Sequence, residues 1–363
     1  MSGLDALPLR DDLRGREPYG APQLDVPVRL NVNENPFAPG PGVVADVASA
    51  VAAVVPELNR YPDRDAQALR RDLAAYLGHG LEARQVWAAN GSNEVMLQLL
   101  QAFGGPGRRA LGFSPTYSMY PDYCRDTFTE YVTVARRDDF SLDAALVTAA
   151  VAEHRPAVVL LASPNNPTGT ALALDVVSAA CEAAHDGIVV VDEAYAEFRR
   201  PQTPSALRLL DEYPHLVVTR TMSKAYSLAG ARVGYLASSP AVVDAVQLVR
   251  LPYHLSAVTQ AVARAALRHE GELLGQVALL RDERDAQVTW LRGRGYDVAD
   301  SDANFVLFGR FARRHVVWQR LLDQGVLVRE TGPDGWLRVS IGTPEENAAF
   351  RAALEVADEE DRS

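Results

Sequence analysis

The sequence has little cysteine, no excess of positive charge and no long apolar run. Two of its 363 residues are cysteines, Cys124 and Cys181. We predict that both are buried in helices of a protein kept in a reducing compartment. No Cys/His cluster has zinc-site spacing, so we predict no metal. Apolar runs stay below the roughly 20 residues that cross a bilayer, and the N-terminus is too polar for a secretory signal, so we expect a cytoplasmic protein. The net charge of −11 argues against a nucleic-acid or anionic-membrane surface.

Composition and pattern predict an α/β protein with two lobes and an N-terminal arm. The length and an apolar content of 48% suit a large core. Residues 1–42 are rich in Pro, Gly and Asn and predict an arm that packs on the C-terminal lobe. In residues 43–252, short apolar strands alternate with amphipathic helices, which is typical of a mostly parallel sheet. Residues 253–363 predict a smaller α+β lobe, which starts with one helical segment over about 257–293.

A lysine lies between two apolar strands expected at 216–220 and 233–236. The small-residue stretch Thr221-Met222-Ser223-Lys224 separates these strands. Burial lowers the pKa of a lysine and gives a neutral amine that can form a Schiff base with a carbonyl. Arg232 adds a fixed cation where the second strand begins. By itself, the lysine would also suit a solvated loop.

Other polar residues follow further expected strands, at the sheet edge where open α/β folds bind ligands. Asp192 ends the run Ile-Val-Val-Val and precedes Tyr195, and a rigid Pro-Asn loop projects Asn165 or Asn166. Each also has a plainer interpretation, as a helix cap or a turn.

Two further segments add to the same expected site. Ser92 and Asn93 begin an apolar helix, whose N-terminus can bind phosphate or simply be capped. Tyr117 follows a strand and could stack on a flat ring. A Schiff-base lysine, an acidic partner for a ring nitrogen and a phosphate cradle together describe a pocket for pyridoxal phosphate.

The motifs in this order resemble the fold-type-I pyridoxal-phosphate aminotransferases, and within them the histidinol-phosphate aminotransferase family. The resemblance rests on these segments: LNVNENP at 30–36, NRYPD at 59–63, GSNE at 91–94, SPTY at 114–117, SPNNPTG at 163–169, DEAY at 192–195, SKAYSLAGAR at 223–232, PYHLSA at 252–257 and LRVSIGT at 337–343. It implies a large domain with a mostly parallel seven-stranded sheet flanked by helices, and a smaller α+β domain.

The resemblance also implies roles for individual residues. Lys224 would hold the cofactor and move protons, Asp192 would pair with the ring nitrogen, and Tyr195 and Asn166 would reach the ring oxygen. Tyr117 would stack on the ring. The cofactor phosphate would meet Ser92, Asn93, Ser223, Arg232 and Tyr61 of the neighbouring subunit, which implies a homodimer. Substrate positions correspond to Tyr19, Asn33, Arg329 and Arg338. The two arginines lie nine residues apart across a Gly/Pro turn, which fits a hairpin.

The implied reaction is transamination of L-histidinol phosphate with 2-oxoglutarate, giving imidazole acetol phosphate and L-glutamate in histidine biosynthesis. Both half-reactions would use one site in a ping-pong cycle through pyridoxamine phosphate. Rival interpretations are an aromatic amino-acid aminotransferase, a threonine-phosphate decarboxylase and a non-catalytic cofactor-binding regulator. The regulator would need a fused DNA-binding domain, for which the arm of about 40 residues is short. A dinucleotide-binding protein lacks support, because no G-x-G-x-x-G follows the first expected strand.

Overall fold

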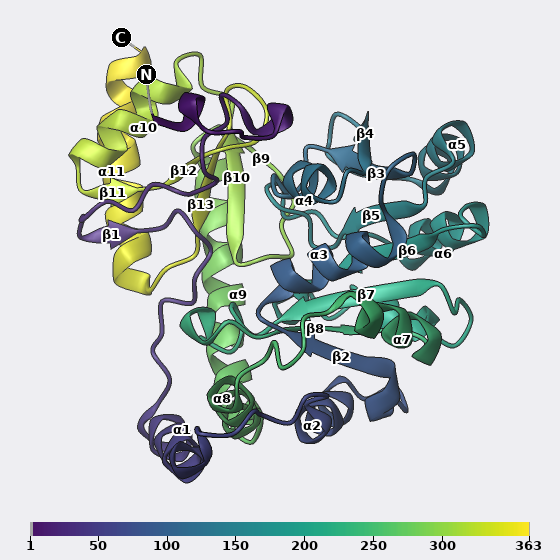
Figure 1. The fold of residues 1–363 in the computed structure, drawn as a ribbon. Helices are drawn as coiled ribbons and strands as arrows, with labels where there is room; N and C mark the ends of the chain where they lie inside the picture. The colour runs from purple at the N-terminus through teal and green to yellow at the C-terminus, as the bar shows by residue number, and fades with distance from the viewer. Residues whose placement is uncertain (1–2, 363) are drawn as a thin grey trace.

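The structure, a computed structural model, describes residues 3–362 and contains two main sheets and eleven α-helices among them. Figure 1 shows the large sheet and its helices on one side, and the C-terminal elements with the N-terminal arm on the other. The α-helices are α1 Pro41–Val54, α2 Gln67–Leu77, α3 Ser92–Phe103, α4 Tyr120–Asp126, α5 Ala144–His154, α6 Leu174–Ala183, α7 Pro240–Val249, α8 Ala257–Leu267, α9 Glu270–Gly293, α10 Arg314–Asp323 and α11 Pro344–Arg362.

The large sheet has seven strands in the order β2-β8-β7-β6-β5-β3-β4. Its pairs are parallel except that β8 runs antiparallel to both of its neighbours. The strands are β2 Val86–Ala89, β3 Arg109–Ser114, β4 Glu130–Ala135, β5 Val158–Ala162, β6 Ile188–Asp192, β7 Leu216–Thr221 and β8 Gly234–Ala237. This is the mostly parallel seven-stranded sheet that the sequence led us to expect.

The central strands are apolar throughout because both faces of the sheet are covered. In β6, Val189 and Val191 join one hydrophobic cluster, whereas Ile188 and Val190 join the other. Side chains of α3, α4 and α7 fill the core on one face, and those of α2, α5, α6, α8 and α9 fill the other. A parallel strand buried on both sides has no polar face to show. Polar residues on these strands therefore concentrate at the strand ends.

The second sheet is antiparallel, in the order β12-β13-β10-β9, and the arm joins the elements beside it. Its strands are β9 Asp297–Val298, β10 Phe305–Gly309, β12 Arg329–Glu330 and β13 Leu337–Ser340. In the arm, β1 Val28–Arg29 pairs in parallel with β11 Val326–Leu327. The second sheet, α10 and α11 share the larger hydrophobic cluster with one face of the large sheet. One continuous core thus connects both sheets.

Two sequence expectations need correction. The single helical segment over 257–293 is wrong, because the chain turns between α8 and α9. At this turn the N–H of Arg268 donates to the carbonyl of Ala265, three residues earlier, at 3.2 Å. The His269 side chain bonds the carboxylate of Asp46 in α1 at 2.9 Å. The strands predicted from pattern for the large sheet, at 109–113, 131–134, 157–162, 188–191, 216–220 and 233–236, also left out β2, a four-residue edge strand. Both cysteines are buried in helices as predicted, Cys124 in α4 and Cys181 in α6.

Between residues 3 and 362, the helices are all too short or too polar to cross a membrane. Within the same residues, His, Cys, Asp and Glu side chains form no group of three or more arranged to hold a metal ion.

Candidate active site

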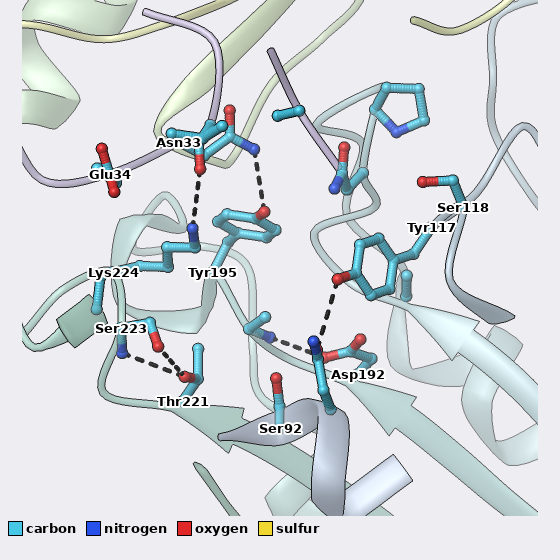
Figure 2. A pocket seen from close by; sticks show the side chains of 18 of the residues that line it. Asn33, Glu34, Ser92, Tyr117, Ser118, Asp192, Tyr195, Thr221, Ser223 and Lys224 are labelled. Atoms are coloured by element: carbon cyan, nitrogen blue, oxygen red, sulfur yellow. Dashed lines mark hydrogen bonds between the residues drawn. The ribbon is translucent and has the colours of Figure 1, made fainter. Parts of the chain in front are cut away.

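A pocket of about 460 Å³ lies where the carboxyl ends of the central strands face the arm and the second sheet (Figure 2). Thirteen of the fourteen residues that the sequence singled out line it: Tyr19, Asn33, Ser92, Asn93, Tyr117, Asn166, Asp192, Tyr195, Ser223, Lys224, Arg232, Arg329 and Arg338. They come from segments more than 300 residues apart in the chain. The fold therefore brings together residues that are far apart in the sequence.

Asp192 is the last residue of β6 and is 7% exposed. Its carboxylate accepts hydrogen bonds from Tyr120 Oη (3.1 Å), Thr219 Oγ1 (3.3 Å) and the N–H of Ala194 (3.2 Å). Burial raises the pKa of Asp192 to about 6, although these three bonds act in the opposite direction. All three donors are neutral groups. The carboxylate therefore offers its charge to a cation that enters the pocket.

Lys224 follows β7 and lies in the same pocket. Burial lowers its pKa to about 8, with further contributions from the Arg338 and Arg232 guanidinium groups. Its Nζ donates to the carbonyl of Val32 in the arm at 3.0 Å. An amine with this pKa is partly neutral near pH 7.5, and the neutral form is the nucleophile and base. The arm thus bounds the space in which the amine moves.

The two asparagines that the sequence left open have different positions. Asn165 is fully buried and holds its own loop, with Oδ1 accepting from Thr116 Oγ1 at 2.9 Å and Nδ2 donating to Thr168 Oγ1 at 2.7 Å. Asn166 instead lines the pocket, where its Oδ1 accepts from Nη1 of Arg338. The geometry therefore selects Asn166 as the residue that a ligand can reach.

Tyr195 connects the large sheet to the arm. Its hydroxyl accepts a hydrogen bond from Nδ2 of Asn33 at 3.0 Å, and its ring meets that of Phe305 edge-on at 5.0 Å. Burial raises the pKa of Tyr195, so the phenol stays protonated at neutral pH and can donate to a ligand. Figure 2 shows Asn33 and Tyr195 joined by this hydrogen bond, above Asp192 in the view.

The N-terminus of α3 forms a cradle with Ser223 and Arg232. Gly91 caps the helix at a φ of 82°, in the left-handed region that glycine adopts freely. A Cβ at this position would collide with the Arg232 guanidinium, which itself donates to Ser223 Oγ at 3.3 Å. Ser92 and Asn93 present their N–H groups at the positive end of the helix dipole. Such a set of donors suits a phosphate group.

The two arginines of the second sheet are neighbours, as the hairpin interpretation expected: Arg329 of β12 and Arg338 of β13 are partners in the antiparallel register. Arg338 is 6% exposed. It donates to Asn166 and to the carbonyl of Asn31 (2.8 Å), and its buried Nε has no partner among the described residues. Burial lowers the pKa of Arg338 to about 10, so the group remains a cation. An anionic substrate group would supply the missing acceptor.

At the mouth of the pocket, Tyr19 is 52% exposed, and its hydroxyl accepts from Ser118 Oγ at 3.2 Å. Nearby, Tyr117 approaches Asn93 through its hydroxyl at 3.5 Å and meets the ring of Tyr120 edge-on. Tyr61 is the one singled-out residue that lies outside the pocket. It is 79% exposed and stacks on Tyr253, with the ring centroids 4.4 Å apart.

The sequence interpretation missed Tyr120 and Thr219, which hold Asp192, and Glu193, which follows it. Glu193 is buried on the other side of the strand and pairs with Arg220 at 2.8 Å and Arg199 at 3.2 Å. Burial would raise the pKa of Glu193, but the two arginines outweigh burial and hold it low. Alternation along the strand end could have indicated that Asp192 and Glu193 face opposite sides.

A fold and a pocket of this kind define a class of group-transfer enzymes, and the comparisons agree. The family model described as "Aminotransferase class I and II" matches residues 26–354. A histidinol-phosphate aminotransferase of Thermobifida fusca is 65% identical over 351 residues, covering 97% of this chain and 95% of the relative. Another, from Frankia casuarinae, is 63% identical and covers 96% of this chain and 90% of the relative.

A solved structure gives the same result at lower identity. The histidinol-phosphate aminotransferase of Sinorhizobium meliloti, in complex with pyridoxal-5'-phosphate, superposes with a TM-score of 0.83 at 26% identity, covering 92% of each chain. The chain belongs to the class I and II aminotransferases and, within them, to the histidinol-phosphate aminotransferases.

Proposed function

We propose that this protein transfers the amino group of L-histidinol phosphate to 2-oxoglutarate with pyridoxal phosphate as cofactor, a step of histidine biosynthesis. The observation that carries the proposal is that a carboxylate and an amine, both buried, line the same pocket. Asp192 is a buried carboxylate with neutral donors, and Lys224 is an amine whose pKa burial lowers to about 8. The named relatives support the same assignment.

The residues present fit the cofactor. The cradle at Gly91, Ser92, Ser223 and Arg232 has the donors and the close approach that a phosphate requires. Pyridoxal phosphate, when bound, supplies a ring that accepts electrons released at the substrate Cα. Asp192 would hold a proton at the ring nitrogen, because the protonated nitrogen would supply the positive partner that the carboxylate lacks. Asn166 and Tyr195 would bind the ring oxygen, and Tyr117 would stack on the ring.

Lys224 would carry the cofactor and then move the proton of the substrate Cα. With a pKa of about 8, its amine can take up a proton and return it near neutral pH, which is what a general base and acid needs. The neighbouring cations Arg338 and Arg232 favour its neutral form. The carbonyl of Val32 holds Nζ on the arm side of the pocket.

The substrate's phosphate would bind at the arginine pair. A phosphate monoester has nearly two charges and three acceptor oxygens, so two guanidinium groups suit it better than one. Arg338 and Arg329 are adjacent across β12 and β13, and Tyr19 adds a hydroxyl at the mouth. Asn33 would contribute from the arm. In the second half-reaction, Arg338 would receive a carboxylate of 2-oxoglutarate.

We also propose a homodimer in which Tyr61 reaches the cofactor phosphate of the other subunit. Its support is the exposed ring stack of Tyr61 on Tyr253, next to Leu251, which is 72% exposed. The chain would divide into the arm (1–42), a large cofactor-binding domain (43–252) and a small domain (253–363). A cytoplasmic location fits two free, buried thiols.

A substrate panel tests the proposal. Purified protein reconstituted with pyridoxal phosphate should convert histidinol phosphate with 2-oxoglutarate far faster than it converts phenylalanine. A preference for phenylalanine would replace the proposal with an aromatic amino-acid aminotransferase, which would share every cofactor residue. Release of CO₂ from threonine phosphate would indicate a decarboxylase instead.

A further inference from the structure

The short segment 301–304, between β9 and β10, contacts three parts of the chain that line the pocket. The N–H of Asp302 donates to Gly169 O at 2.9 Å, in the loop that carries Asn166. Nδ2 of Asn304 donates to the carbonyl of Asn33 at 3.1 Å, and the carbonyl of Asn304 accepts from the N–H of Ile341 at 2.8 Å, just after β13. The segment is therefore bonded to the loop, to the arm and to the strand of Arg338.

The contact with the loop leaves little free space. Gly169 has a φ of 78°, and a Cβ built on it would collide with the backbone and side chain of Ser301. Ser301 in turn donates from Oγ to Phe305 O at 2.6 Å, which fixes the entry into β10. A shift of the segment would therefore be passed on to the loop that holds Asn166.

On the side away from the pocket, a charged cluster holds the segment in place. Arg200 binds Asp302 Oδ1 at 2.5 Å and the carbonyl of Ser301 at 2.9 Å through Nη1. Thr203 donates to the other carboxylate oxygen of Asp302 at 2.5 Å. The Asp302 side chain is only 7% exposed, and Arg200 is 27% exposed. Arg200 and Thr203 follow Asp192 by eight and eleven residues, so this cluster joins the segment after β6 to the second sheet.

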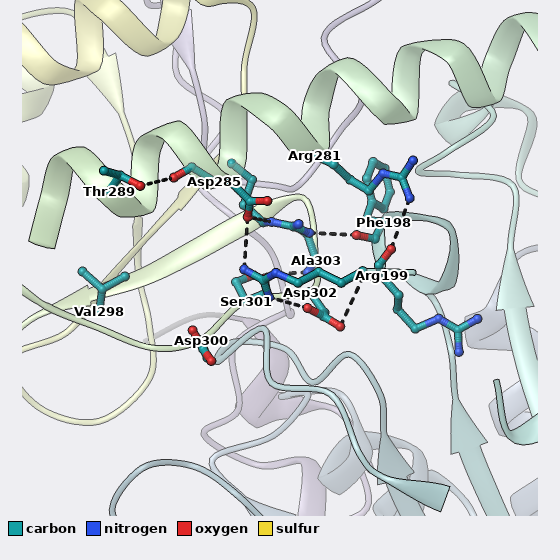
Figure 3. A network of polar contacts seen from close by, with 12 residues as sticks. Phe198, Arg199, Arg281, Asp285, Thr289, Val298, Asp300, Ser301, Asp302 and Ala303 are labelled. Atoms are coloured by element: carbon teal, nitrogen blue, oxygen red, sulfur yellow. Dashed lines mark hydrogen bonds and ion pairs between the residues drawn. The ribbon is translucent and has the colours of Figure 1, made fainter. Parts of the chain in front are cut away.

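The long helix α9 completes the cluster, as Figure 3 shows with Asp285 above Ser301 and Asp302. Asp285 accepts from Nη2 of Arg200 at 3.0 Å and from Nε of Arg284, also at 3.0 Å. Arg284 is 1% exposed and donates to the carbonyl of Phe198 at 2.7 Å. Because Asp285 is half exposed, its pair with Arg200 is the weaker of the two that Arg200 makes.

We infer that Asp302 and Arg200 are positioning residues, whose ion pair sets where the Arg338–Asn166–Asn33 side of the pocket lies relative to Asp192 and Lys224. The inference rests on the proposed function, because it assumes that this side binds the substrate anion. Neither residue lines the pocket, so they act through segment 301–304. A misplacement of about 1 Å can cost about 100-fold in rate. The effect falls mainly on substrate binding, since the paired strands β6 and β7 place Asp192 and Lys224.

The test compares three conservative variants of the holoenzyme. For Asp302→Asn we expect the KM of histidinol phosphate to rise about tenfold or more, while the pH titration of the cofactor absorbance changes much less, because Asp192 and Lys224 keep their places. Hydrogen–deuterium exchange should become faster in peptides covering 163–170 and 337–341. Asp285→Asn, which removes a carboxylate from the same guanidinium, should change KM by less than about twofold. Asp72→Asn, which breaks the Arg264 pair of 2.6 Å between α8 and α2, should do the same.

Several outcomes would overturn the inference. Equal KM values for Asp302→Asn and Asp285→Asn, or unchanged exchange in both peptides, would show that the pair is only structural. If Asp302→Asn does not fold, Arg200→Lys takes its place as the test. Lysine keeps the positive charge but lacks the planar guanidinium that binds several acceptors, so the KM of Arg200→Lys should lie between those of wild type and Arg200→Ala. The double variant Arg200→Ala/Asp302→Ala should be no worse than the more severe single variant. If the wild type does not convert histidinol phosphate, the proposed function is overturned instead. The hydrogen–deuterium exchange measurements would still show whether the Arg200–Asp302 ion pair holds the pocket segments in place.

Discussion

Asp192 and Lys224 follow neighbouring strands of one buried sheet, whereas Arg338, Asn33 and Asn166 come from three separate segments that meet at its edge. The first side is fixed by strand pairing and by two hydrophobic cores. The second side depends on a few hydrogen bonds among loops, the arm and β13. With the proposed roles, the chemistry would lie on the rigid side of the pocket, and substrate recognition would lie mainly on the assembled side. Changes on each side should have different effects.

The largest effect should come from Lys224 on the rigid side. Lys224→Ala removes both the amine that carries the cofactor and the base, and we expect turnover to fall by about 10,000-fold or more. Borohydride reduction of the wild type should fix the cofactor to the peptide that contains Lys224. Label on a different lysine would contradict the assignment.

Asp192→Asn should reduce turnover by about 100-fold or more, because an amide cannot keep the ring nitrogen protonated. Steady-state assays at saturating substrates measure this loss. Turnover close to wild type would limit the carboxylate to a structural role.

The same substitution should stabilise the cofactor-free protein. The fold raises the pKa of Asp192 from 3.8 to about 6. Between these values the native state binds more protons than the unfolded state, so the wild type loses up to about 3 kcal/mol as pH rises through this window. The lowered pKa of Lys224 affects the stability of wild type and of Asp192→Asn equally, so it cancels in the difference between them. Asp192→Asn should therefore unfold at a higher temperature than wild type at pH 7.5 and at a similar one near pH 4.

Asp300→Asn is the matched control for this measurement, since its carboxylate is 77% exposed. We expect no pH-dependent difference for it. A cofactor-free Asp192→Asn protein that is less stable than wild type at pH 7.5 would mean that its hydrogen bonds outweigh the cost of the buried charge.

On the assembled side, the two arginines should differ. Losing one partner of a desolvated charge pair costs about 2–5 kcal/mol, so Arg338→Ala should abolish useful activity with any substrate. Arg329 is only half buried, and Arg329→Ala should lower kcat/KM for histidinol phosphate by about tenfold or more while affecting phenylalanine much less. Equal losses for both substrates would remove Arg329 from phosphate recognition.

The smallest effect should come from Tyr61, which would contribute one hydroxyl from a neighbouring subunit in the proposed dimer. Tyr61→Phe should weaken cofactor binding by about five- to tenfold, in line with the loss of one hydrogen bond of ordinary net strength, about 1 kcal/mol. Tyr253→Phe keeps the ring stack and should bind cofactor as wild type does. Sedimentation should show a dimer in each case, and a fully active monomer would contradict the proposed arrangement.

The comparison also explains what the sequence could predict. Asp192, Tyr195 and Lys224 were predictable because polar residues at the ends of apolar strands must meet at one edge of a parallel sheet. Arg329 and Arg338 came from the resemblance to the family, and their spacing across a Gly/Pro turn was consistent with the hairpin that the structure shows. Tyr120 was not predictable, because its bond to Asp192 joins residues 72 apart and depends on how α4 packs.

Two other features stayed hidden for different physical reasons. The carbonyl of Val32 bonds Lys224 through the backbone, which has the same chemistry in every residue. The turn between α8 and α9 interrupts a sequence that remains helical in pattern, and the contact of His269 with Asp46 is tertiary. The large sheet was predictable strand by strand apart from β2, which ends in two alanines, a residue that favours strands little.

The pairing of β1 with β11 has a consequence for synthesis on the ribosome. Val28 is made almost 300 residues before its partner Val326. At roughly 5–20 residues per second, the arm waits about 15–60 s for this pairing. The seven strands of the large sheet are complete by Ala237, so Lys224 can reach its place in the sheet while the growing chain still lacks Arg338. The arm carbonyl that meets the lysine amine therefore becomes fixed only when translation is nearly finished, and until then Lys224 lacks the arm that helps to bury its amine.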